Sequence, residues 1–122
     1  MSIKTIIEPE YIVHIPDSTE TLEKILTYIT DNFDLWKDKN TLWDVREFNF
    51  NNLNHEIMES FTEKIIPVTK SREGLKTAFV VKDDLAFGMT RMLQMLYTEK
   101  LHMDVNIFKN MDDAIDWLLK KN

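Results

Sequence analysis

The sequence contains no cysteine, and only two of its 122 residues are glycine. Without cysteine the chain has no disulfide framework, no thiolate metal site and no cysteine nucleophile. Basic residues are also in the minority: 15 Lys and Arg stand against 21 Asp and Glu, a formal net charge of −6. Binding to nucleic acid is not expected, because nonspecific binding depends on Lys and Arg displacing the counterions of phosphates. Basic residues are widely spaced in the stretch from Lys64 to Lys82, which is interpreted as a solvated face.

Long apolar runs are missing as well, so no membrane span is expected. The first residues, "MSIKTIIEPEYIVHIP", lack the basic start, long apolar run and small-residue cleavage site of a signal peptide. We therefore expect a soluble, cytoplasmic protein. The length suits one domain with an apolar core of its own, so residues 1–122 are predicted to form a single domain.

The first third of the chain predicts a β-hairpin followed by a helix. Two β-rich runs, residues 3–7 and 11–15, flank a turn signal at Glu8-Pro9-Glu10. Asp17 and Ser18 are candidate N-caps of an amphipathic helix whose apolar stripe extends to Trp36. Antiparallel strands therefore open the fold.

The remaining elements alternate between strand and helix. "TLWDVREF" predicts a strand, and a helix follows from about Asn54 that Pro67 should end or kink near Ile66. "TAFVV" has no polar alternation, which is typical of a strand covered on both faces. A third helix runs from about Asp84 to Lys100, and "DVNIF" and "MDDAIDWLL" supply the last strand and helix. The inward stripe of the third helix is predicted to contain Leu85, Met89, Met92, Leu93 and Leu96.

The predicted fold class is therefore α/β, with a mixed five-stranded sheet opened by a β-hairpin and four helices. Alternation of strands and helices implies parallel strands joined by right-handed crossovers.

Three blocks, "TLWDVREF", "KTAFVVKDDLAFGMTRM" and "VNIFKNMDDAIDWL", resemble those of the small bacterial SpoIIAA-like proteins of the STAS superfamily. The resemblance extends over nearly the whole chain. It implies the fold named above and two kinds of activity, regulatory protein binding as in anti-sigma-factor antagonists and lipid carriage as in the related CRAL-TRIO fold. The antagonists' phosphorylatable serine is not matched, because no Ser or Thr occurs between Arg46 and Ser60.

Charged residues follow three predicted strands at the edge where open α/β sheets usually bind ligands. They are Asp44, Arg46, Asp83, Asp84 and Lys109. The alternative is structural: an aspartate caps the helix, and Asp44 and Arg46 neutralise each other. A third interpretation is acid–base catalysis by Asp44 and Asp83, which requires both carboxyl groups to face one cleft.

Gly88 is unexpected in the first turns of a helix, where glycine costs roughly 1 kcal/mol relative to alanine. We expect it to allow close packing against a neighbouring element, and the alternative is the close approach of a ligand or partner. Phe87, Arg91 and Met95 lie four residues apart beside the inward stripe and suit a partner surface, although the final helix or another subunit could cover them as core.

Other chemistry has little support in the sequence. The methionines at 89, 92, 95 and 103 could line a pocket for a small lipid-like ligand, but more often fill core. His14, His55 and His102 show no metal-ligand spacing, and there is neither a nucleophile elbow nor a Gly-rich phosphate loop. We therefore expect no cofactor, no metal and no catalysis. The hypothesis is a binding module that contacts a protein partner or a second copy around residues 83–95, and the alternative is a carrier of a small amphipathic or anionic ligand.

Overall fold

The computed structural model describes residues 3–51, 53–72, 74–101 and 103–120. The predicted order of strands and helices is confirmed. Its elements are β1 (Ile3–Ile7), β2 (Tyr11–Pro16), α1 (Leu22–Asp31), α2 (Phe33–Trp36), β3 (Asn40–Asp44), α3 (His55–Thr69), a 3₁₀ turn (Lys70–Arg72), β4 (Lys76–Val80), α4 (Asp84–Leu101), β5 (Asp104–Phe108) and α5 (Met111–Leu119).

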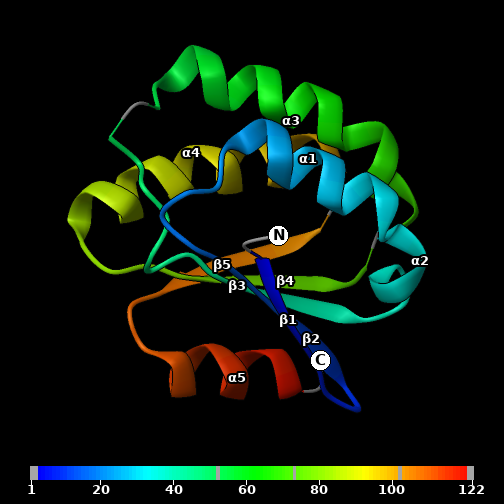
Figure 1. Ribbon diagram of the computed structural model, residues 1–122. Coiled ribbons are helices and arrows are strands. Elements are labelled where there is room, and N and C mark those ends of the chain that lie inside the picture. The colour runs from blue at the N-terminus through cyan, green and yellow to red at the C-terminus, as the bar shows by residue number, and fades with distance from the viewer. Residues whose placement is uncertain (1–2, 52, 73, 102, 121–122) are drawn as a thin grey trace.

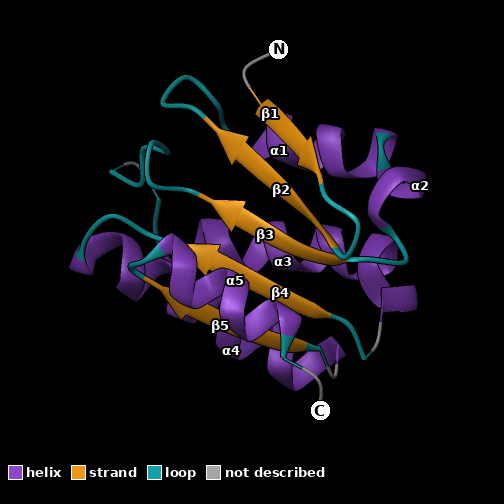
Figure 2. Cartoon of the chain, turned by 90° about the horizontal axis from the view of Figure 1, so that it is seen from below, coloured by secondary structure: helices purple, strands orange, loops and turns teal. Residues whose placement is uncertain are grey.

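The five strands form one mixed sheet in the order β1-β2-β3-β4-β5 (Figure 2). β1 pairs antiparallel with β2, and the other three pairings are parallel. β4 lies between β3 and β5, as the apolar "TAFVV" run predicted, and all of its residues are buried. The carboxyl ends of four parallel strands therefore share one edge of the sheet.

The helices cover the two faces of the sheet unequally (Figure 1). α1, α3 and α4 lie on one side and α5 alone on the other, where it packs on β3, β4 and β5. The larger core lies on the three-helix side and includes Trp43, Phe61 and Phe79, whereas the α5 side has a small cluster around Leu42, Ala78 and Val80. Alternate residues of β3 and β4 thus enter different cores, because successive side chains of a strand point to opposite faces.

The first predicted helix differs from the observed one at both ends. Its N-cap is Thr21, whose Oγ1 accepts the amide of Lys24 at 3.2 Å, whereas Asp17 forms a local turn with Thr19. The helix ends at Asn32, where the side-chain amide and the backbone N–H both donate to the Tyr28 carbonyl at 3.0 Å. The continuous apolar stripe concealed this break, so the described residues form five α-helices, one more than the four predicted.

Pro67 does not end α3, which was one of the two predicted outcomes, since the helix continues to Thr69 and then tightens into the 3₁₀ turn. Both Pro67 and Glu63, whose carbonyl loses its helical donor, are exposed, so water can satisfy that carbonyl. The connection to β4 turns at Gly74, which has a φ of 89° that L-residues rarely adopt.

Candidate functional site

At the carboxyl edge of the sheet, Asp44 ends β3 and pairs with Arg46 two residues later. Nε and Nη2 of the guanidinium each donate to a different carboxylate oxygen at 2.8 Å. The hydrogen bond to Asp44 raises the pKa of Arg46 above its usual range. Asp44 is buried, and both of its oxygens are used by this fork. The predicted mutual neutralisation is confirmed.

The two aspartates that open α4 have separate structural tasks. Asp83 Oδ1 accepts the amide of Ala86 at 2.9 Å and so caps the helix. Asp84 forms an ion pair with Lys109, and the hydrogen bond from Lys109 lowers the pKa of the Asp84 carboxyl. The Lys109 ammonium also lies 5.8 Å from the centre of the Phe87 ring. These contacts hold the start of α4 against the end of β5.

Two of the predicted edge charges line a common groove. Arg46 and Asp83 face a groove of about 330 Å³ between residues 45–51 and the first residues of α4. Asp44 and Lys109 do not line it. The sheet edge therefore carries local ion pairs and caps, and the catalytic interpretation loses the shared cleft that it requires for Asp44 and Asp83.

The outward side of α4 departs most from the sequence analysis. Leu85, predicted to point inward, is 56% exposed, and Met95 is 62% exposed. Gly88 is exposed too, and a Cβ added to it would meet no atom within 4 Å. Close packing within the chain, the expected reason for this glycine, is therefore wrong.

The predicted ridge of Phe87, Arg91 and Met95 is divided in the structure. Phe87 is half-buried and packs against the larger core, whereas Arg91 is exposed, as is Met95. We call this side of the helix the α4 outer face; it comprises the exposed residues Asp84, Leu85, Gly88, Arg91 and Met95 and the half-buried Met92, whose other side packs against the larger core. Apolar side chains therefore remain in solvent on a helix whose opposite side is core.

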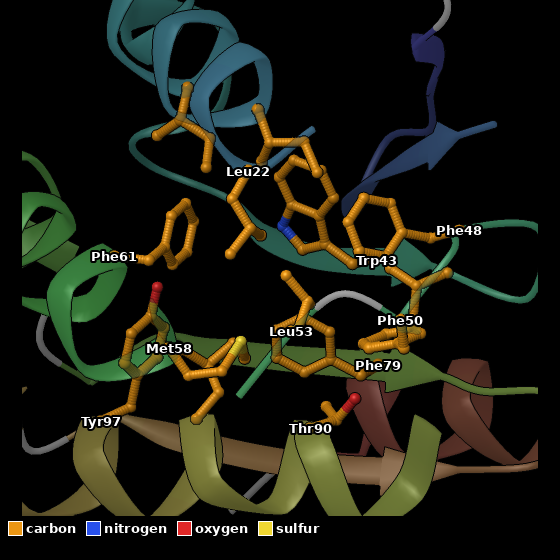
Figure 3. Close-up of a pocket in the computed structure, with 14 residues that line it drawn as sticks. Leu22, Trp43, Phe48, Phe50, Leu53, Met58, Phe61, Phe79, Thr90 and Tyr97 are labelled. Atoms are coloured by element: carbon orange, nitrogen blue, oxygen red, sulfur yellow. The ribbon is translucent and has the colours of Figure 1, made fainter. Parts of the chain in front are cut away.

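On its inner side, α4 borders an apolar cavity (Figure 3). The cavity has a volume of about 60 Å³. Leu22, Phe50 and Leu53 are only partly buried and mark its mouth. Its wall consists of Leu22, Ile25, Ile29, Trp43, Val45, Phe48, Phe50, Leu53, Met58, Phe61, Phe79, Thr90, Leu93 and Tyr97.

The predicted methionine pocket is not this cavity. None of the methionines at 89, 92, 95 and 103 lines it, and α4 contributes Thr90, Leu93 and Tyr97 instead. Figure 3 shows the Tyr97 side chain rising from α4 towards Phe61, with its hydroxyl at the far end. The pKa of this phenol is raised by burial, so the hydroxyl stays neutral near pH 7.

A buried polar cluster near the amino ends of the strands was missed by the sequence analysis. Arg72 is only 2% exposed, although it belongs to the stretch interpreted as a solvated face. It donates to the Lys39 carbonyl at 2.7 Å and lies 4.8 Å above the Trp36 ring. Burial lowers the pKa of Arg72 to about 10. Among the described residues no carboxylate pairs with it, and its Nε has no hydrogen-bond partner.

His14 belongs to the same cluster. Its Nδ1 lies 3.1 Å from the Tyr28 hydroxyl, and its ring packs 4.5 Å from that of Trp43. Burial first, and the charge of Arg72 second, lower the pKa of His14 from 6.5 to about 3. The imidazole is therefore neutral at physiological pH. In the sequence, the burial of His14 is indicated only by its place in the strand β2, and that place does not show which residues pack against the imidazole.

Lys76 is the second buried cation in the stretch that was interpreted as solvated. Its ammonium donates to the carbonyls of Trp117 at 3.0 Å and Lys120 at 2.6 Å. These carbonyls lie at the C-terminus of α5, where a positive charge is favourable. Lys76 therefore attaches α5 to the sheet.

Two absences apply to the described part of the chain. No group of three or more His, Asp or Glu side chains there is placed to hold a metal ion. No helix there has the length and apolar character needed to cross a bilayer. His102, one of the three histidines considered above, lies outside the described residues.

Comparison with protein-family models, curated proteins and solved structures found no match to this chain.

Proposed function

We propose that this protein is a noncatalytic binding module that contacts a protein partner through the α4 outer face. The observation that carries the proposal is Gly88, an exposed helical glycine with open space where its Cβ would lie. Glycine in a helix costs about 1 kcal/mol relative to alanine, and nothing within the described chain requires it here. A backbone that approaches from another molecule would require it.

The side chains around Gly88 support the same proposal. Leu85 and Met95 are two of the most exposed large apolar side chains of the described residues, and Arg91, one turn before Met95, is exposed as well. Methionine and arginine are enriched at interface cores. The likeness to SpoIIAA-like proteins agrees with a binding role and stays a prediction, as does the absence of a phosphorylation switch between Arg46 and Ser60.

Site-specific photo-crosslinking in cells tests this proposal. A photoreactive amino acid at Met95 should give a discrete adduct, whereas the same residue at Leu119, also exposed but on α5, should give none. Adducts of equal yield from both positions, or from neither, would remove the α4 outer face as the contact surface. The mass of the adduct tells a second copy from a different protein.

A second candidate function is binding of a small apolar molecule, and the aromatic cavity supports it. About 60 Å³ is well below the roughly 150 Å³ that admits benzene in an engineered cavity. A lipid-like ligand would therefore have to displace the segment that carries Phe48, Phe50 and Leu53. Native mass spectrometry of protein purified from cells should show an extra mass that denaturation releases. Leu93→Phe, which fills the cavity from α4, should abolish it, and a clean apo mass for the unmodified protein would end this alternative.

A further inference from the structure

The α4 outer face is self-complementary about Gly88. Asp84 lies four residues before the glycine and Arg91 three after it, while Leu85 lies three before and Met92 four after. Viewed down the helix at roughly 100° per residue, the two charged residues lie on one flank of Gly88 and the two apolar residues on the other. One flank therefore has an acidic and a basic residue at nearly equal distances on either side of Gly88, and the other flank has two apolar residues at nearly equal distances from it.

We infer that the partner bound by this face is a second copy of the same chain, with the two α4 helices antiparallel and crossing at Gly88. The inference rests on the proposed function and names its partner. In such a pair a two-fold axis passes beside Gly88, perpendicular to both helices. It reverses the direction of the second helix, and the charged flanks of the two helices face each other, as do the two apolar flanks. Asp84 of one protomer then lies beside Arg91 of its partner, and Leu85 lies beside Met92, each pair occurring twice.

The charges in the structure permit these contacts. The Asp84 side chain is 94% exposed even with Lys109 paired to one of its oxygens, so its other oxygen can accept a further bond. Arg91 is exposed and makes no ion pair with any described residue. Complementary charge on both sides of the axis favours a copy of this face over an unrelated surface, because an unrelated partner would need no such symmetry.

Mixing two single variants tests the arrangement directly. Arg91→Glu alone places two carboxylates together at both ion-pair positions, and Asp84→Arg alone places two guanidinium groups together. Sedimentation velocity should show association weakened about 10-fold or more for each variant. An equimolar mixture should recover the wild-type dimer, because each heterodimer keeps one original ion pair and forms a second one in which the two charges have exchanged places.

Gly88→Leu tests the crossing point without disturbing the fold. Apart from the neighbouring turns of α4 itself, no atom of the described residues lies within 4 Å of the added Cβ, so the unfolding midpoint should not fall, while the dimer should be lost. Thr98→Leu adds the same kind of side chain at an exposed position of α4 further from the crossing and should leave the dimer intact.

The outcomes separate this inference from the proposed function. A wild-type chain that stays monomeric up to the highest soluble concentration, or a dimer indifferent to both charge variants and to Gly88→Leu, overturns the antiparallel dimer. A mixture that associates no better than its two components overturns it as well. In each case, a crosslink from position 95 to a different protein would still support the proposed function.

Discussion

The two ends of the sheet handle charge in opposite ways. At the carboxyl end, Arg46 and Lys109 are exposed, and each pairs with a carboxylate, the buried one of Asp44 and the exposed one of Asp84. At the amino end, Arg72 is buried and meets only neutral oxygens and the face of Trp36. An exposed ion pair contributes little to stability, whereas a buried cation is costly unless its surroundings satisfy it. We therefore expect Arg46 and Lys109 to be replaceable at little cost in stability, and the buried Arg72 to be required by the packing around it.

The largest expected effect is that of Arg72→Ala. The change removes the hydrogen bond to the Lys39 carbonyl and leaves a void beside Trp36, so the free energy of unfolding should fall by about 3 kcal/mol. Urea denaturation measures this. Lys70→Ala, an exposed neighbour in the same 3₁₀ turn, is the control and should change little. A loss for Arg72→Ala no larger than that of the control would mean that the buried cation is dispensable.

The second effect is a loss of stability in acid due to His14. The pKa of His14 is about 3 in the folded protein and near 6.5 in the unfolded chain. Below pH 6.5 the imidazole therefore binds a proton in the unfolded chain but stays neutral in the folded protein. Stability is thus complete above pH 6.5 and is lost as the pH falls towards 3. Between pH 7.5 and pH 5 the loss should be about 2 kcal/mol.

Urea denaturation at these two pH values, on the wild type and on His14→Gln, measures the contribution of His14. The variant should lose most of this pH dependence, while His55→Gln, at an exposed histidine, should keep it. Equal pH dependence in all three proteins would show that His14 titrates normally in the folded state.

A smaller effect is expected for Arg46→Ala at the carboxyl end. Asp44 is buried and would lose both donors of its fork, so unfolding should become easier by about 1 kcal/mol. Arg46→Lys keeps the charge but not the fork and should recover only part of the loss. Full recovery by lysine would show that charge alone matters there.

The smallest effect is expected for Lys109→Met. Its ion pair with Asp84 lies in solvent, so the urea midpoint should not change measurably, at low or at high salt. A clear destabilisation at low salt would place Lys109 with Arg72 among the residues that the fold needs, and would erase the contrast between the two ends.

Much of the fold could be predicted because its signals are local or periodic. The hairpin, the doubly covered "TAFVV" strand and the final helix follow from turn signals, apolar runs and helical spacing. Two features could not be predicted. The first helix breaks at Asn32, where the side-chain amide donates a hydrogen bond to the Tyr28 carbonyl. Helix α3 continues through Pro67, which is tolerated because the Glu63 carbonyl that loses its donor is on an exposed residue.

The candidate site was harder to predict than the fold. A helical wheel shows which residues share a side of α4 but not how far the neighbouring elements extend over it, so Leu85 was placed inside although it is outside. Arg72 was interpreted as solvated because its neighbours in sequence are polar, while the residues that bury it, Trp36 and Thr41 among them, come from distant parts of the chain. Gly88 was singled out from its helix cost alone, but the reason expected for it, close packing within the chain, was wrong.

The position of α5 has a consequence for folding. This helix, attached by Lys76, is what covers Leu42, Ala78 and Val80 on its side of the sheet. A folding intermediate in which α5 has not yet docked would therefore leave this apolar face of the sheet exposed to water. Transiently exposed apolar surface of this kind makes a folding chain prone to aggregate, so early docking of α5 protects the protein while it folds.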